Sequence, residues 1–251
     1  MSFGDVRRNF DPLFPPRVIH LVLEEPERSH AALLGHNLFT LGTLVGHFEQ
    51  AVSLITYLDE QRAPHRAAMA SDSLEWVSSA EQNRKFVEWK MLTARVAALT
   101  IGNYAETWQV ICAQLSKCPT LAPLQDRTPL KEATRLFRTA FPGHDAARHA
   151  VAHAGKLFDH PDKWARHRWP GTNIYINQMM ADRSVSSTVN GETASFDVTP
   201  HSLEALRQAT ALRFRSYQPI EDHTMTLSRY ISNGVFKPPP TVDDKGSGVA
   251  G

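Results

Sequence analysis

Two long segments of the chain carry apolar residues at the spacing of an α-helix. The first runs from Leu33 to Leu58 and the second from about Ser79 to Leu115. Apolar residues recur in both mostly every three or four positions, which predicts two long helices that each bury one face. A polar stretch rich in Ala and Ser, around residues 61–73, separates them. In the second segment we expect the apolar stripe to be core: Phe86, Trp89, Leu92, Val96, Leu99, Tyr104, Trp108 and Ile111.

Two shorter helical patterns follow, and each begins with residues that suit a helix start. A helix is predicted over residues 129–141, capped from within Asp126–Thr128 and with a proline in its first turn. Another is predicted to begin at Asp145, whose carboxylate suits an N-cap, and to end by Lys156 or Phe158.

The spacing changes to that of β-strands in three places. Val18–Glu24 and residues 173–180 each read as a short strand. Residues 183–198 read as a hairpin with Asn190 and Gly191 at its turn, because this pair tolerates the positive φ of a type I′ turn.

A last helix is predicted from Pro200, with Thr199 as its cap. We expect Arg213 near its charged end, where a cation complements the helix dipole. Residues 237–251 read as a disordered tail. The apolar stripe of this helix is predicted to consist of Leu203, Leu206, Thr210 and Phe214.

These elements predict a mainly α fold, a helical bundle with a small C-terminal antiparallel β-hairpin or sheet and a final helix. The expected organisation is an arm with a short strand (1–29), a helical bundle (30–160), a loop, hairpin and helix extension (161–236) and the tail (237–251). Strands and helices do not alternate and no glycine-rich phosphate loop is present, which argues against a nucleotide-binding βαβ fold.

Composition narrows the class of protein further. The formal net charge is +1 and 21% of residues are charged, so no strong overall field attracts nucleic acid or an anionic membrane. Cys112 and Cys118 are the only cysteines, and their spacing suits neither a zinc knuckle nor a CxxC pair. No signal-peptide core and no consecutive apolar run of membrane length is visible. We expect a cytoplasmic protein with no membrane segment and no cofactor.

The segment DAARHAVAHAGK (145–156) concentrates the candidate chemistry. His149 and His153 are four residues apart and share a helix face, which Asp145 joins four residues earlier. Arg148 and His153 form an Arg-x4-His pair but point about 140° apart on one helix. With 19 arginines and 12 histidines, chance alone gives about one such pair, so the motif depends on its helical context.

In that context the chain resembles the HEPN superfamily (higher eukaryotes and prokaryotes nucleotide-binding domains). The resemblance covers about residues 33–158 and rests on the long helix pair, the third helix and a fourth helix that bears Arg148, His149 and His153. These three residues match the family's Arg, polar residue and His, with histidine where Asn or Asp is commoner. The hairpin and last helix would be an extension of a kind found in some bacterial relatives.

The resemblance implies a metal-independent RNA endonuclease, of the kind found in toxin–antitoxin and defence systems, or a nucleotide-binding module. It also implies a homodimer in which the motif helices face each other across a cleft. His153 would act as general acid or base, since the unperturbed imidazole pKa of about 6.5 lies near working pH. Arg148 would bind the scissile phosphate and His149 would orient the pair.

Other interpretations of the same residues stay open. A metal site would use Asp145, His149 and His153, with further ligands from residues such as His144 or His160, although the glutamate of an HExxH helix is missing. In the alternative to an enzyme, these side chains cap and pack, and the chain is a non-catalytic structural or interaction protein with an unknown protein partner. Basic and aromatic residues alternate in KWARHRW (163–169), a pattern that suits RNA as well as a solvated loop.

Overall fold

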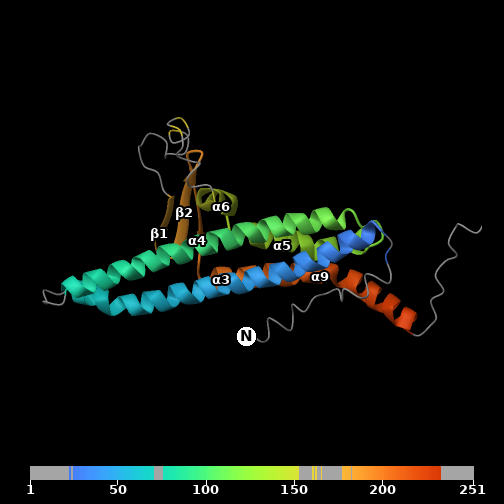
Figure 1. Cartoon of the computed structure of the whole chain (residues 1–251), viewed down its shortest axis with the longest axis horizontal. Coiled ribbons are helices and arrows are strands. Elements are labelled where there is room, and N and C mark those ends of the chain that lie inside the picture. The colour runs from blue at the N-terminus through green and yellow to red at the C-terminus, as the bar shows by residue number, and fades with distance from the viewer. Residues whose placement is uncertain are drawn as a thin grey trace, which may run out of the picture.

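The computed structural model describes residues 23, 25–70, 76–152, 160, 162, 165, 177–181 and 183–232. Within them the chain is mainly helical, with a small antiparallel sheet and a long final helix, as the sequence predicts (Figure 1). The expected N-terminal strand apart from Leu23, the segment KWARHRW apart from Ala165, and the C-terminal tail lie outside the described residues.

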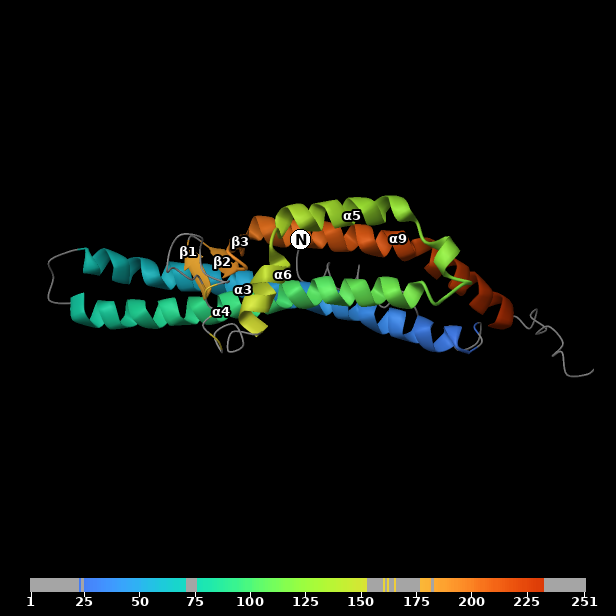
Figure 2. The same cartoon turned by 90° about the horizontal axis from the view of Figure 1, so that it is seen from above.

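Two antiparallel helices, α3 (Glu27–Met69) and α4 (Trp76–Leu115), form a long hairpin, and the end of α9 (Pro200–Ser232) extends beyond it. Buried residues of α3 recur every three or four positions, from Ala31 and Leu34 to Ile55 and Leu58. Helix α5 (Arg127–Ala140) and much of α9 run beside one half of this hairpin, while the teal half, which contains Met69 and Trp76, extends beyond them (Figure 2).

Helix α3 is longer than its apolar stripe predicts, because it continues through the polar stretch to Met69 with Pro64 inside it. Alanine, arginine and glutamine in this stretch favour helix, and contacts to α4 hold it. Arg62 Nε donates to Asn83 Oδ1 at 2.6 Å, and the rings of His65 and Phe86 lie 5.7 Å apart. Tertiary contacts therefore outweigh the local cost of proline.

The core stripe predicted for α4 is wrong in the N-terminal half of this helix. Tyr104 and Ile111 are fully buried, but Trp89, Leu92 and Val96 are 60%, 63% and 46% exposed. The face of this half that is buried carries small and polar residues instead, namely Lys90, Thr93, Ala94, Ala97 and Ala98. The prediction gave weight to large side chains, whereas close helix packing in the hairpin selects small ones.

The predicted start of helix α5 is confirmed. Helix α5 (Arg127–Ala140) is capped by Asp126, whose carboxylate accepts a 2.9 Å hydrogen bond from the Thr128 backbone N–H. It packs beside α9, and its Phe137 ring stacks 5.2 Å from the Tyr104 ring of α4. Helices α4, α5 and α9 therefore share one core.

The sheet has three antiparallel strands in sequence order: β1 (Asn177–Ala181), β2 (Ser184–Val189) and β3 (Glu192–Asp197). The predicted hairpin turn is confirmed, with φ of 54° at Asn190 and 78° at Gly191. Phe196 of β3 packs its ring edge-on, 5.7 Å from the ring of Phe141, which ties the sheet to the helical core.

The last helix, α9 (Pro200–Ser232), confirms its predicted cap and stripe but is much longer than expected. The Ser202 N–H donates to Thr199 Oγ1 at 3.2 Å, as at a capped N-terminus. Leu203, Leu206, Thr210 and Phe214 are all buried. The helix continues beyond Tyr217 and through Pro219, so that Arg213 lies in its middle and not at its end.

Helix α3 is long and apolar enough, by length and composition alone, to cross a membrane, with a mean hydropathy of 1.2 in its most apolar 18-residue window. The sequence expectation considered only consecutive apolar residues and did not detect this window. In the folded chain 44% of the window is buried, and core helices of globular proteins meet the same criterion.

Candidate functional site

The motif helix α6 (His144–Ala152) is placed by a glycine immediately before it. Gly143 has a φ of +69°, which side chains other than glycine rarely adopt, and a Cβ there would lie 2.2 Å from Ala194 Cβ of β3. The helix starts at His144, so Asp145 lies in the first turn and is not the N-cap that the sequence predicts. The chain thus turns sharply against the sheet, and α6 packs across α4.

Arg148 lies against α4 at a second close approach. A Cβ added to Gly102 would come within 2.2 to 2.6 Å of Arg148 Cδ, Cγ and Cβ, so the side-chain stem fills the space above this glycine. One turn further along α4, Glu106 Oε1 lies 2.5 Å from Arg148 Nη1. The Arg148 side chain is 31% exposed, and its buried Nε has no hydrogen-bond partner among the described residues.

The other motif residues are distributed around α6. His149 is exposed, and Asp145 is 82% exposed with its carboxylate 3.3 Å from His144 Nε2. His153 lies outside the described residues. The structure therefore brings Arg148 together with Glu106, a residue that the sequence motif did not include.

A metal site built on α6 has no complete ligand set in the part of the chain that the structure describes. No three His, Cys, Asp or Glu side chains there gather closely enough to hold an ion. His160, one further ligand considered, is near Asp162 on the surface, with Nδ1 to Oδ2 at 3.5 Å. The set Asp145, His149 and His153 is incomplete here because His153 is not described.

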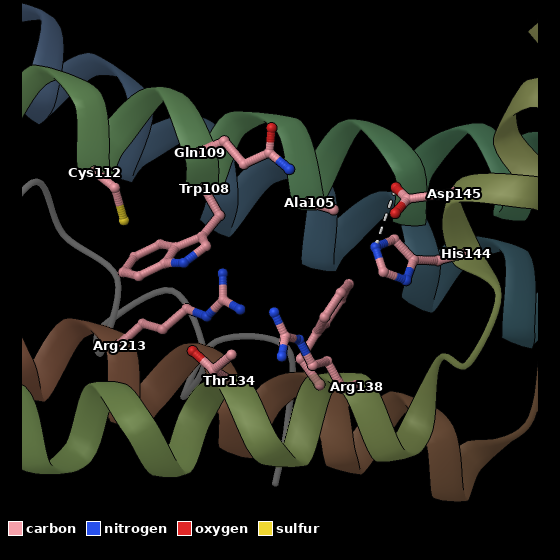
Figure 3. A pocket seen from close by; sticks show the side chains of 10 residues that line it. Ala105, Trp108, Gln109, Cys112, Thr134, Arg138, His144, Asp145 and Arg213 are labelled. Carbon is pink, nitrogen blue, oxygen red and sulfur yellow. Dashed lines mark ion pairs between the residues drawn. The ribbon is translucent and has the colours of Figure 1, made fainter.

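A cavity of about 480 Å³ opens beside this region (Figure 3). Its walls come from α4, α5, the start of α6 and α9. Figure 3 shows the guanidinium groups of Arg213 and Arg138 both turned towards the space between these helices. The lining consists of Ala105, Trp108, Gln109, Cys112, Thr134, Phe137, Arg138, His144, Asp145 and Arg213.

Arg213 is the most unusual residue of this cavity. It is 2% exposed, and its Cζ lies 4.1 Å from the ring centroid of Trp108, 5.1 Å from Tyr104 and 5.3 Å from Phe137. Among the described residues no carboxylate pairs with it, and its Nε and Nη1 have no hydrogen-bond partner. Burial lowers the pKa of Arg213 below its ordinary value.

The burial of the Arg213 guanidinium costs free energy. A cation over an aromatic face gains about 0.5–2 kcal/mol. Each buried donor without an acceptor costs about 1–3 kcal/mol, and more where the group is charged. The Arg213 Cζ lies over the faces of three rings, but the donors on its Nε and Nη1 stay unsatisfied among the described residues.

Sequence reasoning missed Gly102, Glu106 and the role of Arg213. Spacing offered a signal for Arg213, since it follows Thr210 by three positions and precedes Tyr217 by four, on the buried stripe of α9. Its charge led to the wrong interpretation as a helix end. Glu106 follows Gly102 by one turn on α4, but nothing local indicates that Arg148 reaches both.

Comparison with known proteins adds no assignment: no protein family, no curated protein and no solved structure matches the chain.

Proposed function

We propose that the chain is a metal-independent RNA endonuclease of HEPN type, with Arg148 as its phosphate-binding residue. The observation that supports this is the placement of Arg148: a partly exposed guanidinium held in one position by Glu106 and by the close approach to Gly102. Preorganised cationic donors of this kind stabilise the charge that develops on a phosphate.

Arg148 keeps the capacity to bind a phosphate although it is ion-paired. A guanidinium has five N–H donors, and the contact with Glu106 Oε1 involves Nη1 alone. Glu106 is 49% exposed, and a pair this exposed contributes little net stability, so a phosphate can compete for the remaining donors at small cost. Glu106 then acts as a positioning residue.

Cleavage in this proposal needs one general base and one general acid. The base removes the proton of the ribose 2′-hydroxyl as this oxygen attacks the phosphorus, the bond from phosphorus to the 5′-oxygen breaks, and the acid protonates that oxygen. The products are a 2′,3′-cyclic phosphate and a 5′-hydroxyl, and no metal is required. His153 takes the general acid or base role, and His149 orients the phosphate or the pair.

A homodimer in the cytoplasm belongs to the same proposal. Arg148 and His153 are five positions apart and therefore point about 140° apart on a single helix. A second copy, with its own motif helix facing the first across a two-fold axis, brings an arginine and a histidine onto one phosphate. Light scattering at graded protein concentrations tests this, and a strictly monomeric protein with full activity contradicts it.

The experiment is cleavage of a mixed RNA pool by purified protein in EDTA. Wild type should produce cyclic-phosphate ends, and Arg148→Ala should lose at least about 100-fold of the rate. Arg95→Ala, which removes an exposed arginine of α4, should leave cleavage unchanged. Glu106→Gln retains an oxygen acceptor for Arg148 and should stay within about 10-fold of wild type. Equal cleavage by wild type and Arg148→Ala contradicts the assignment.

The alternative, a non-catalytic interaction protein, is favoured by the exposed apolar side chains of the hairpin. Trp89, Leu92 and Val96 recur at helical spacing on α4, and Tyr57 of α3 is 55% exposed. Exposed apolar patches mark interaction sites when they are contiguous. A folded protein that leaves the RNA pool intact in all variants favours this alternative.

A further inference from the structure

The buried guanidinium of Arg213 lacks both a counter-charge and acceptors for two of its nitrogens among the described residues, and it lines a cavity. We propose that this cavity binds a small organic oxyanion. Its carboxylate or phosphate headgroup lies against Arg213, and its apolar body lies against Trp108 and Phe137. This site goes beyond the nuclease proposal and does not depend on it.

Contacts to the aromatic rings explain why the guanidinium is tolerated without explaining what it binds. Rings of Tyr104, Trp108 and Phe137 lie around its Cζ, at centroid distances of 5.1, 4.1 and 5.3 Å. Such contacts stabilise the charge but accept few N–H hydrogen bonds. An oxyanion at the edge of the guanidinium supplies acceptors and neutralises the charge in the same place.

The charge of the lining also favours an anion. Arg138 lines the cavity and has no carboxylate partner among the described residues. His144 is 17% exposed and its ring lies 5.0 Å from that of Phe137. Asp145 is the one acidic residue in the described lining; it is 82% exposed and lies beside His144 Nε2. Cations thus outnumber carboxylates around the space.

The size and the remaining walls indicate a small molecule as the ligand. A volume of about 480 Å³ lies within the range of small-ligand sites and is too small for a folded polymer segment. Gln109 and Thr134 offer polar groups that can orient the ligand, while Ala105, Trp108 and Phe137 form apolar wall. A headgroup with a flat apolar body fits this combination.

The first test measures binding by calorimetry and by the shift in Tm. The probes are phenyl phosphate, phenylacetate and the neutral benzyl alcohol, and inorganic phosphate tests whether a headgroup is sufficient. We expect saturable binding and a raised Tm with at least one aromatic anion, and neither with benzyl alcohol. The phosphate and carboxylate arms show which headgroup the site selects.

Two matched variants connect the binding to Arg213. Arg213→Met retains much of the side-chain volume and removes the charge, and it should weaken binding at least about 10-fold. Arg215→Met removes an exposed arginine two positions further along α9 and should bind like wild type. Equal affinities for wild type and Arg213→Met overturn the proposal, and so does the absence of saturable binding of both aromatic anions by wild type.

Cys112 provides a readout that does not depend on the folding of a variant. It is exposed and lines the cavity, whereas the other cysteine, Cys118, is buried. Alkylation of folded wild type with a maleimide should therefore modify Cys112, and a bound anion should slow this reaction. An alkylation rate that is unchanged at a saturating concentration of the anion places the ligand elsewhere and overturns the proposal.

Discussion

Two arginines in neighbouring parts of the molecule have opposite environments. Arg148 on α6 is partly exposed and lies 2.5 Å from a carboxylate, while Arg213 on α9 is 2% exposed and has no carboxylate partner among the described residues. Solvent and Glu106 compensate the first charge, whereas the second lies over three aromatic rings. The two proposals therefore give these arginines different roles: Arg148 binds a phosphate at the surface, and Arg213 binds an anion in a cavity.

A third arginine, Arg183, shares the carboxylate of Asp59 with Lys90. Removing the charge of this carboxylate gives the largest expected loss of stability. Asp59 of α3 accepts hydrogen bonds from Lys90 Nζ at 2.6 Å and from Arg183 Nε at 2.9 Å. Asp59→Asn leaves the buried Lys90 without its counter-charge and loosens the sheet from the hairpin. We expect a loss of about 2 kcal/mol in the free energy of unfolding, measured by urea denaturation.

The pH dependence of the free energy of unfolding shows whether Asp59 stabilises the fold through its charge or through its packing. Burial raises the pKa of Asp59, but the hydrogen bonds and charges of Lys90 and Arg183 outweigh it and hold the pKa below its ordinary value. Asp59 thus stabilises the fold above its unfolded-state pKa of about 4, and this stability is lost as the pH falls through the lower folded-state value. The gap between wild type and Asp59→Asn should shrink in acid; a constant gap argues against the charge.

Gly102→Ala probes the placement of Arg148. Gly to Ala within a helix ordinarily stabilises by about 1 kcal/mol. Here the new Cβ would meet the stem of Arg148 at 2.2 Å, so α6 has to move, and we expect destabilisation by about 1–2 kcal/mol and slower RNA cleavage. The Arg148→Ala background removes two of the three close atoms and should relieve much of the loss. A stabilised Gly102→Ala protein contradicts the close packing.

Arg213→Met should have the smallest effect on the stability of the ligand-free protein. The variant loses the contacts to three rings but no longer buries an uncompensated charge. These effects oppose each other, and we expect a free energy of unfolding within about 1 kcal/mol of wild type. A loss above about 3 kcal/mol would identify Arg213 as a structural brace of the aromatic cluster.

Sequence patterns predicted most of the elements well where their signals are local, although the local signal for an N-cap at Asp145 was wrong. The Asp126 and Thr199 caps and the Asn190–Gly191 turn depend on a few neighbouring residues, and all three are confirmed. Helix lengths were harder, because contacts across the hairpin carry α3 through Pro64 to Met69. Neighbouring residues in the sequence do not reveal these contacts, so they do not predict where α3 ends.

Long-range pairing explains what was missed in the candidate site. Arg148 pairs with Glu106, a residue of another helix that lies 42 positions earlier in the chain, and this pair has no local signature. The exposed Trp89 and the buried Arg213 each reverse the usual link between residue type and burial. Such reversals occur where function or close packing outweighs hydrophobicity, which is why both need the three-dimensional structure.

The most direct test of this division of roles is a parallel assay of RNA cleavage in EDTA by wild type, Arg148→Ala and Arg213→Met. The account predicts cyclic-phosphate products from wild type and from Arg213→Met at similar rates, and at least about a 100-fold lower rate from Arg148→Ala. Cleavage that survives in Arg148→Ala, or that is lost in Arg213→Met alone, would contradict it.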